Sequence, residues 1–128
     1  MDVKSREEII KFAQKLNSTN LSPLRSGNIS LKAQNNNNNE EGFLITPSGK
    51  KYDSLKADDI VFVSLEGRYD EKGLQPSSEW RFHKDIYLKK ADAKAVVHAH
   101  SPHATAVSAH NKDIPAFHYM IALAGGDN

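Results

Sequence analysis

The stretch from Pro76 to His100, PSSEWRFHKDIYLKKADAKAVVHAH, predicts a helix followed by a strand. From Glu79 to about Lys89 the pattern is helical, and Phe82 and Ile86 share one face, which we expect to be buried. Residues 95–100, AVVHAH, are mostly apolar and predict a strand that is covered on both faces. We expect the rest of the chain to be organised around these two elements.

Two other places carry the signals of a helix start. Ser5 and Glu8 have the spacing of a capping box, and an amphipathic pattern continues from them to about Leu16. Ser101 and Pro102 are the residue types preferred at the N-cap and at the first helical position. We therefore expect one helix after each pair.

Three short segments predict strands. Residues 26–31 begin as a turn and become a strand, and residues 43–46 and 60–64 have strand character. The polar run 34–39, mostly asparagine, cannot bury apolar surface, so it predicts an expanded hairpin loop between the first two strands. Strands that alternate with helices favour a layered α/β domain with a mixed sheet, in which the early strands are antiparallel.

Length and composition favour one soluble domain, residues 1–128. A chain of 128 residues can bury about two thirds of its unfolded surface in one core. The 17 Lys and Arg residues nearly balance the 16 Asp and Glu residues and are scattered, which argues against nucleic acid as a partner. The chain has neither a secretory signal nor an apolar run of the roughly 20 residues that a membrane helix needs. We therefore expect a cytoplasmic protein with no membrane partner.

His98 and His100 are candidate metal ligands. Side chains two apart on a strand point to the same side, so both imidazoles can reach one ion. The chain has no cysteine, which leaves His, Asp and Glu as strong ligands and suits zinc, manganese or iron. A histidine pair alone does not close a catalytic site, which takes three protein ligands. His83, His110 and His118 fit surface or structural roles better.

Glu79 is a candidate general base beside the metal, although an acidic residue also favours a helix start through the macrodipole. Ser77 or Ser78 can cap the helix, and serine hydroxyls and free amides at a helix start also suit a phosphate group. Small turn residues elsewhere suit phosphate in the same way, although each alone is more often only a turn: Gly27, Asn28, Ser48 and Gly49.

Five ordered motifs resemble the class II aldolase and adducin family over nearly the whole chain. The motifs are GNIS (27–30), ITPSG (45–49), PSSEWRFH (76–83), AVVHAH (95–100) and IPAFHYMIALAGG (114–126). The resemblance implies a three-layer α/β/α sandwich with a mixed, largely antiparallel sheet. It also implies that this domain is incomplete at its C-terminus, because the family's third zinc-binding histidine lies beyond the glycine pair of the last motif.

The activity implied by the resemblance is that of a zinc-dependent aldolase. Such an enzyme reversibly cleaves a ketose 1-phosphate, similar to L-fuculose 1-phosphate, into dihydroxyacetone phosphate and an aldehyde. In this sequence His98 and His100 match zinc ligands, and Glu79 matches the acid/base, which can also approach the metal. Tyr119 matches a proton donor that reaches a neighbouring subunit's site, which implies a homotetramer. The positions that match phosphate-binding residues are Asn28, Ser48, Gly49, Ser77 and Ser78.

Other functions stay open within and beyond this family. A methylthioribulose-1-phosphate dehydratase keeps a glutamate at this position, whereas a pentulose-phosphate 4-epimerase usually has an aspartate-type ligand where this chain has Glu79. A non-catalytic adducin-like binding module or an inactive fragment is the alternative of another class, and the His98/His100 pair argues against it. Residues 22–26 and the asparagine run depart from the family pattern, so the sequence does not name the aldehyde.

Overall fold

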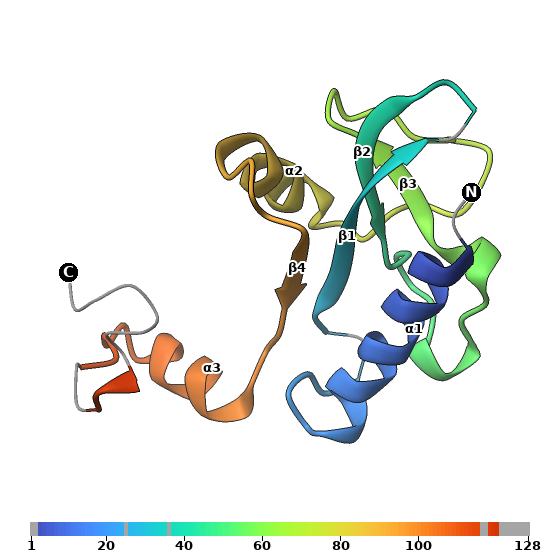
Figure 1. Cartoon of the computed structure of the whole chain (residues 1–128). Helices are drawn as coiled ribbons and strands as arrows, with labels where there is room; N and C mark the ends of the chain where they lie inside the picture. The colour runs from blue at the N-terminus through green and yellow to red at the C-terminus, as the bar shows by residue number, and fades with distance from the viewer. Residues whose placement is uncertain (1–2, 25, 36, 116–117, 121–128) are drawn as a thin grey trace.

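The computed structural model describes residues 3–24, 26–35, 37–115 and 118–120. The elements in chain order are α1 (Val3–Ser18), β1 (Asn28–Asn35), β2 (Glu40–Ile45), η1 (Tyr52–Ser54), η2 (Ala57–Asp59), β3 (Val61–Ser64), α2 (Trp80–Lys89), β4 (Ala95–His98) and α3 (Pro102–Ala109). Within the described part of the chain the strands form one sheet in the order β3-β2-β1-β4, and every strand pair is antiparallel (Figure 1).

Helices cover both faces of this sheet, and side-chain alternation along the strands sorts residues between two clusters. On β2, Leu44 packs in the cluster under α1, whereas Phe43 and Ile45 pack in the cluster with α2. This alternation is expected because successive side chains of a strand point to opposite faces. The predicted three-layer α/β/α arrangement with a largely antiparallel sheet is confirmed.

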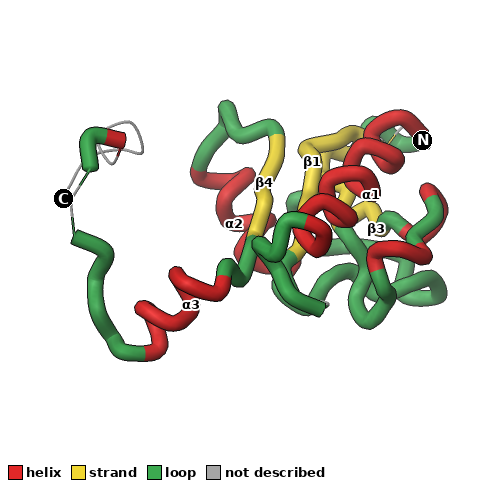
Figure 2. Tube along the Cα trace, turned by 90° about the horizontal axis from the view of Figure 1, so that it is seen from below, coloured by secondary structure: helices red, strands yellow, loops and turns green. Residues whose placement is uncertain are grey.

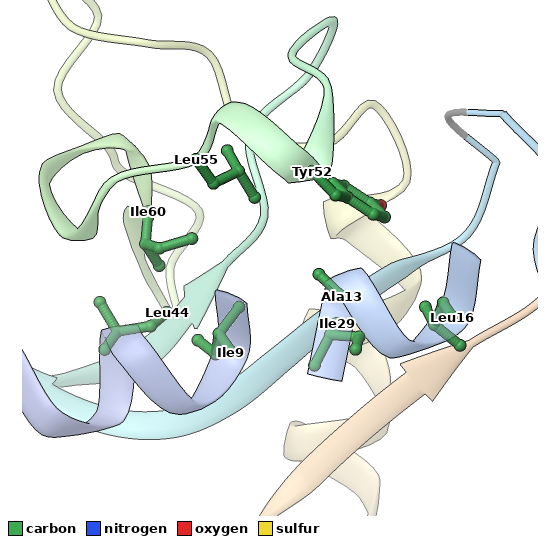
Figure 3. Close-up of a cluster of buried hydrophobic side chains, with 8 residues drawn as sticks. All are labelled: Ile9, Ala13, Leu16, Ile29, Leu44, Tyr52, Leu55 and Ile60. Carbon is green, nitrogen blue, oxygen red and sulfur yellow. The ribbon is translucent and has the colours of Figure 1, made fainter. Parts of the chain in front are cut away.

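Helix α1 buries one stripe against the sheet, formed by Ile9, Ala13 and Leu16 (Figure 3). The amphipathic pattern predicted these three positions correctly, but the same pattern also includes Phe12, which is 43% exposed. The predicted start is wrong, because α1 begins at Val3 and both Ser5 and Glu8 lie inside its first turns. Opposite the stripe lie β1, β2 and the short turns η1 and η2, which supply the other members of the cluster: Ile29, Leu44, Tyr52, Leu55 and Ile60.

A hairpin lies at the asparagine run, as predicted, but the loop is shorter than the predicted 34–39, because Gln34 and Asn35 belong to β1 and pair with β2. Strands β1 and β2 pair in register from Ser30 opposite Ile45 to Asn35 opposite Glu40. Asn39 closes the tip with a φ of 55°, a left-handed conformation that asparagine adopts more readily than most residues. The hairpin places Asn28, at the start of β1, at the opposite end of the sheet from this loop.

Helix α2 buries a different face from the one predicted. Trp80, His83 and Tyr87 are the buried residues, whereas Phe82 and Ile86 are only half-buried. The three buried positions follow helical spacing, so the periodicity was right and the face was displaced. This different face has a physical cause. Asn28 and Ser30 of β1 form hydrogen bonds with His83, so the polar ring can be buried between α2 and the sheet.

Strand β4 lies at the edge of the sheet and its Val97 is 60% exposed. The predicted cover on both faces is therefore wrong for the described residues. Helix α3 begins at Pro102 with Ser101 in the N-cap position, as predicted, and it has no buried residue. It extends away from the sheet in both views (Figures 1 and 2). None of the helices that the structure describes has the length and apolar character required to cross a membrane.

Candidate metal and phosphate site

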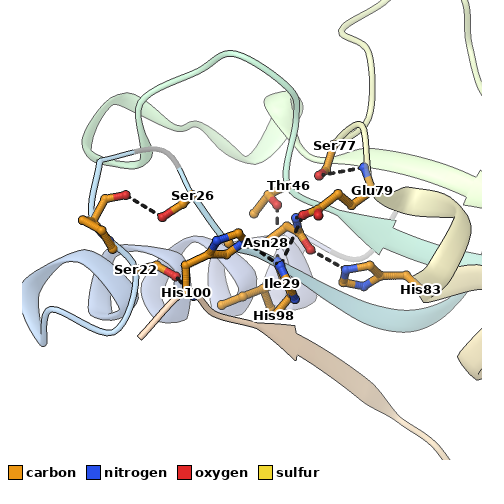
Figure 4. Close-up of polar contacts among 12 residues, drawn as sticks. Ser22, Ser26, Asn28, Ile29, Thr46, Ser77, Glu79, His83, His98 and His100 are labelled. Carbon is orange, nitrogen blue, oxygen red and sulfur yellow. Dashed lines mark hydrogen bonds and ion pairs between the residues drawn. The ribbon is translucent and has the colours of Figure 1, made fainter. Parts of the chain in front are cut away.

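Glu79, His98 and His100 come together at one end of the sheet (Figure 4). Their candidate ligand atoms all lie within 4.8 Å of one another. The Nε2 atoms of His98 and His100 are 2.8 Å apart, and His98 Nε2 is 3.4 Å from Glu79 Oε2. Two imidazole nitrogens and a carboxylate oxygen suit zinc or a similar divalent ion, so the predicted residues fit a metal site.

The predicted strand 95–100 is too long, because β4 ends at His98 and His100 lies two residues beyond it. The loop between α1 and β1 holds this segment after β4 in place. The backbone N–H of His100 donates to the hydroxyl of Ser22 at 2.9 Å, and Ser22 is fully buried. Gly27 has a φ of +80°, and a Cβ there would lie 2.4 Å from Ser22 Oγ and 2.6 Å from the carbonyl oxygen of His98. Only glycine fits this contact without displacement. Sequence reasoning missed Ser22, which carries no local signal of this role.

A pocket of about 240 Å³ lies beside the candidate metal ligands. All the predicted phosphate-binding residues line it, together with Glu79 and His100: Asn28, Ser48, Gly49, Ser77 and Ser78. Two distant segments are joined to build it, because Ser77 N donates to Thr46 O at 3.0 Å and Ser48 N donates to Gln75 O at 2.9 Å. Small residues from both segments therefore surround one polar space, which suits a phosphate group.

Lys50 and Tyr52 also line this pocket and were missed from the sequence. Lys50 forms an ion pair with Asp59 at 2.6 Å and brings a positive charge to the pocket, which suits an anionic ligand. The buried Tyr52 hydroxyl donates to the carbonyl oxygen of Gly27. Lys50 directly follows Gly49, so its place in the sequence was a usable signal, whereas the inward position of Tyr52 depends on the turn η1.

Glu79 occupies the N-cap position of α2. The predicted serine cap is wrong, because no side chain caps this helix and Ser77 Oγ only accepts a long hydrogen bond of 3.4 Å from Glu79 N. The Glu79 carboxylate instead accepts a hydrogen bond of 2.6 Å from the side-chain amide of Asn28. The helix start thus directs a carboxylate toward the histidines.

Tyr119 is 75% exposed and does not line the pocket of its own chain. Its predicted role in a neighbouring subunit stays a prediction. His110 and His118 are exposed, in agreement with the surface role expected for them. His83 is fully buried, which agrees with a structural role.

Burial lowers the pKa of His83 to about 4, and the nearby His98 acts in the same direction while Glu79 opposes it. In an unfolded chain the histidine pKa is about 6.5. Below that pH the unfolded state binds a proton that the folded state does not accept until about pH 4. Stability is therefore unaffected at higher pH and falls as the pH drops through this range.

We expect His83 to destabilise the fold by about 3 kcal/mol between roughly pH 7 and pH 4, relative to a variant without this group. Chemical denaturation of the wild type and of His83→Gln at several pH values measures the effect as a difference in slope. The slope of the free energy of unfolding against pH should be steeper in the wild type. Parallel curves for the two proteins would contradict the expectation.

The family model described as "Class II Aldolase and Adducin N-terminal domain" matches residues 7–128. The chain is 44% identical over 125 residues to L-fuculose phosphate aldolase of Escherichia coli, covering 98% of this chain and 55% of that protein. It is 42% identical to 5-methylthioribulose-1-phosphate/5-deoxyribulose-1-phosphate aldolase of Rhodospirillum rubrum, covering 96% of this chain and 52% of that protein.

A solved structure of L-fuculose 1-phosphate aldolase superposes with a TM-score of 0.80 at 35% identity, covering 93% of this chain and 54% of that one. The chain spans about half the length of the curated relatives it matches. The sequence match, the shared fold and the site geometry lead to one conclusion. The chain belongs to the class II aldolase and adducin N-terminal domain family.

Proposed function

We propose that the protein is a metal-dependent aldolase that reversibly cleaves a ketose 1-phosphate, similar to L-fuculose 1-phosphate, into dihydroxyacetone phosphate and an aldehyde. The observation that carries this proposal is that one polar pocket is lined by the predicted phosphate-binding residues, by the Glu79 carboxylate and by the candidate metal ligand His100. The names of the relatives support it, because this chain is similar to an L-fuculose phosphate aldolase and to a 5-methylthioribulose-1-phosphate/5-deoxyribulose-1-phosphate aldolase.

In this proposal the pocket binds the phosphate of the substrate and so fixes the position of the reacting carbons relative to Glu79. Hydroxyl and amide groups of Asn28, Ser48 and Ser77 contact the phosphate oxygens, and Lys50 offsets their charge. A phosphate held in this way orients the substrate before reaction, and orientation is a large contribution to the rate. The Glu79 carboxylate on the rim of the pocket then lies beside the three-carbon part that follows the phosphate.

In this proposal Glu79 transfers a proton to C3 of the ketose in one direction of the reaction and removes it in the other. In the cleavage direction the C3–C4 bond of the ketose breaks, and its electron pair stays on C3 as part of an enediolate. As the aldehyde forms, the C4 hydroxyl passes its proton to Tyr119 of the neighbouring subunit, the group that in the synthetic direction donates a proton to the aldehyde oxygen. Glu79, which carries a proton in the cleavage direction, gives that proton to C3 to yield dihydroxyacetone phosphate. In the synthetic direction the Glu79 carboxylate removes the same proton from C3.

His98 and His100 would hold the divalent cation, with Glu79 close to it in the absence of substrate. When bound, such a cation acts as a Lewis acid that polarises the substrate carbonyl and stabilises the negative charge of the enediolate. A catalytic zinc takes three protein ligands, so a third histidine from the complete protein belongs to this proposal. We also place Tyr119 of each subunit at the site of its neighbour in a homotetramer, which its high exposure permits.

Aldol cleavage by the full-length, zinc-loaded protein tests the proposal directly. We expect L-fuculose 1-phosphate or 5-deoxyribulose 1-phosphate to yield dihydroxyacetone phosphate, detected through coupled reduction to glycerol 3-phosphate. The unphosphorylated ketose is the matched control and should react far more slowly, because it cannot occupy the phosphate pocket. An intact carbon chain that has lost water would identify a dehydratase, and no reaction of any sugar phosphate would favour a binding module.

A further inference from the structure

A row of buried polar side chains lies behind Glu79, between α2 and β1. Asn28 donates to Glu79, and its Oδ1 contacts His83 Nε2 (Figure 4). On the other side of the ring, His83 Nδ1 lies 2.7 Å from Ser30 Oγ, which lies 2.8 Å from the hydroxyl of Tyr87. Asn28, Ser30, His83 and Tyr87 are each at most 3% exposed. The row therefore connects the catalytic carboxylate of the proposal to the interior.

The hydrogen bonds of this row have only one consistent direction while Glu79 is ionised. A carboxylate only accepts, so the amide nitrogen of Asn28 faces Glu79 and its oxygen faces His83. His83 must then carry its proton on Nε2, which leaves Nδ1 as an acceptor for the hydroxyl of Ser30. Ser30 has a single proton, so it accepts from Tyr87.

A neutral histidine suits the middle of this row, because it is a donor on one nitrogen and an acceptor on the other. Burial keeps the pKa of His83 low, at about 4, so the ring is neutral near neutral pH. Contacts on both nitrogens hold the His83 ring in one orientation. The ring then prevents the Asn28 amide from rotating by 180°, which would interchange the positions of its oxygen and nitrogen. The amide N–H groups are thereby kept on the side of Glu79 and of the phosphate pocket.

The same face of the sheet carries the candidate metal ligand. Asn28 and His98 are direct partners across β1 and β4. The carboxylate oxygen that accepts from Asn28 is the one that lies 3.4 Å from His98 Nε2. A 180° flip of the Asn28 amide would therefore change the contacts of the Glu79 carboxylate and the lining of the pocket at the same time. It would place an amide oxygen against a carboxylate oxygen, which is repulsive.

We propose that His83 is a positioning residue, which acts through Asn28 to hold the Glu79 carboxylate and the phosphate pocket in their working arrangement. Its effect on catalysis rests on the proposed function, whereas its effect on the Asn28 amide does not. His83 does not touch the reacting atoms. It is needed because Asn28 alone could present either end of its amide to the site.

The tautomer of His83 is the first test, and it requires no activity. Nitrogen NMR of the full-length protein, with His83 assigned by its loss in His83→Gln, should show a neutral ring protonated on Nε2 near neutral pH. A ring protonated on Nδ1 would reverse the direction of the row and overturn the proposal. This result stands whether or not the protein proves to be an aldolase.

Two variants of His83 separate positioning from packing. His83→Gln keeps a donor that can reach Asn28, whereas His83→Leu fills similar space with none. We expect kcat/KM to fall about 10- to 100-fold in His83→Leu, as for other buried residues that orient active-site groups, and to recover largely in His83→Gln. The side-chain amide signals of Asn28 should shift in His83→Leu and stay near their wild-type positions in His83→Gln.

Ile9→Val, in the cluster under α1, is the control for a general loss of stability, because it costs about 1 kcal/mol far from the site. It should leave kcat/KM unchanged. Equal losses in both His83 variants with unmoved Asn28 signals would show that His83 only packs, and full activity in His83→Leu would also overturn the proposal. If His83→Leu does not fold, His83→Gln and the tautomer still decide. Absence of aldolase activity in the wild type would fail the proposed function alone.

Discussion

Glu79→Gln is expected to slow hydrogen exchange at C3 of dihydroxyacetone phosphate by about 100- to 10,000-fold, the usual contribution of a positioned general base. Glutamine keeps the size of the side chain and an oxygen that can accept from Asn28, which in the wild type donates at 2.6 Å. It cannot take a proton from carbon. Loss of deuterium from labelled substrate, followed by proton NMR, measures this step without the aldehyde.

Glu66→Gln is a suitable control, because Glu66 lies on the surface beside Arg68 and away from the pocket. The control should exchange at the wild-type rate. Exchange by Glu79→Gln at the wild-type rate would exclude Glu79 as the base. If Glu79→Gln cleaves the substrate slowly but exchanges hydrogen at the wild-type rate, Glu79 acts in the step that breaks the C3–C4 bond and not in proton removal from C3.

The hairpin and the helix α1 were predictable because their signals are local. The asparagine run cannot bury apolar surface, so a turn between two strands was predictable there, although β1 continues further into the polar segment than expected and Asn35 pairs with Glu40. The stripe of Ile9, Ala13 and Leu16 follows from spacing alone. The start of α1 was misplaced because a capping-box spacing can also occur within a helix, as it does at Ser5 and Glu8.

The buried face of α2 was not predictable from apolar periodicity. The helix turns a histidine and a tyrosine toward the sheet because Ser30 offers both of them a hydrogen-bond partner. That partner is more than fifty positions away in the sequence. The exposure of β4 was not predictable for a similar reason. An apolar strand pattern indicates that a strand is buried, but it does not identify the elements that cover it.

The candidate site was predicted from two kinds of information. The spacing of His98 and His100 on a strand suggested a shared ion, and the structure brings both within reach of Glu79. The union of Ser48 and Ser77 in one pocket came from the family resemblance, because it depends on backbone hydrogen bonds between the loops after β2 and before α2. Ser22 and His83 were missed as supports of the site, since their partners are known only once the sheet has formed.

His98→Ala or His100→Ala is expected to weaken zinc binding by at least about 100-fold, because loss of a ligand should exceed the effect of losing a residue that only orients one. Aldol cleavage and C3 exchange should fall with zinc content. Elemental analysis after dialysis at defined free zinc measures the binding. His110→Ala, on an exposed histidine just after α3, is the matched control and should keep both zinc and activity.

The comparison of zinc content between the variants separates the two roles that Glu79 can have. If Glu79 is the base and only approaches the metal without substrate, Glu79→Gln should keep its zinc while it loses exchange. The histidine variants should lose both. In a combined His98→Ala/His100→Ala variant the losses should not add, because either single change already removes the ion on which the site depends. Stoichiometric zinc in that combined variant would exclude these histidines as the ligands, and loss of zinc in Glu79→Gln would make Glu79 a permanent ligand instead of the base.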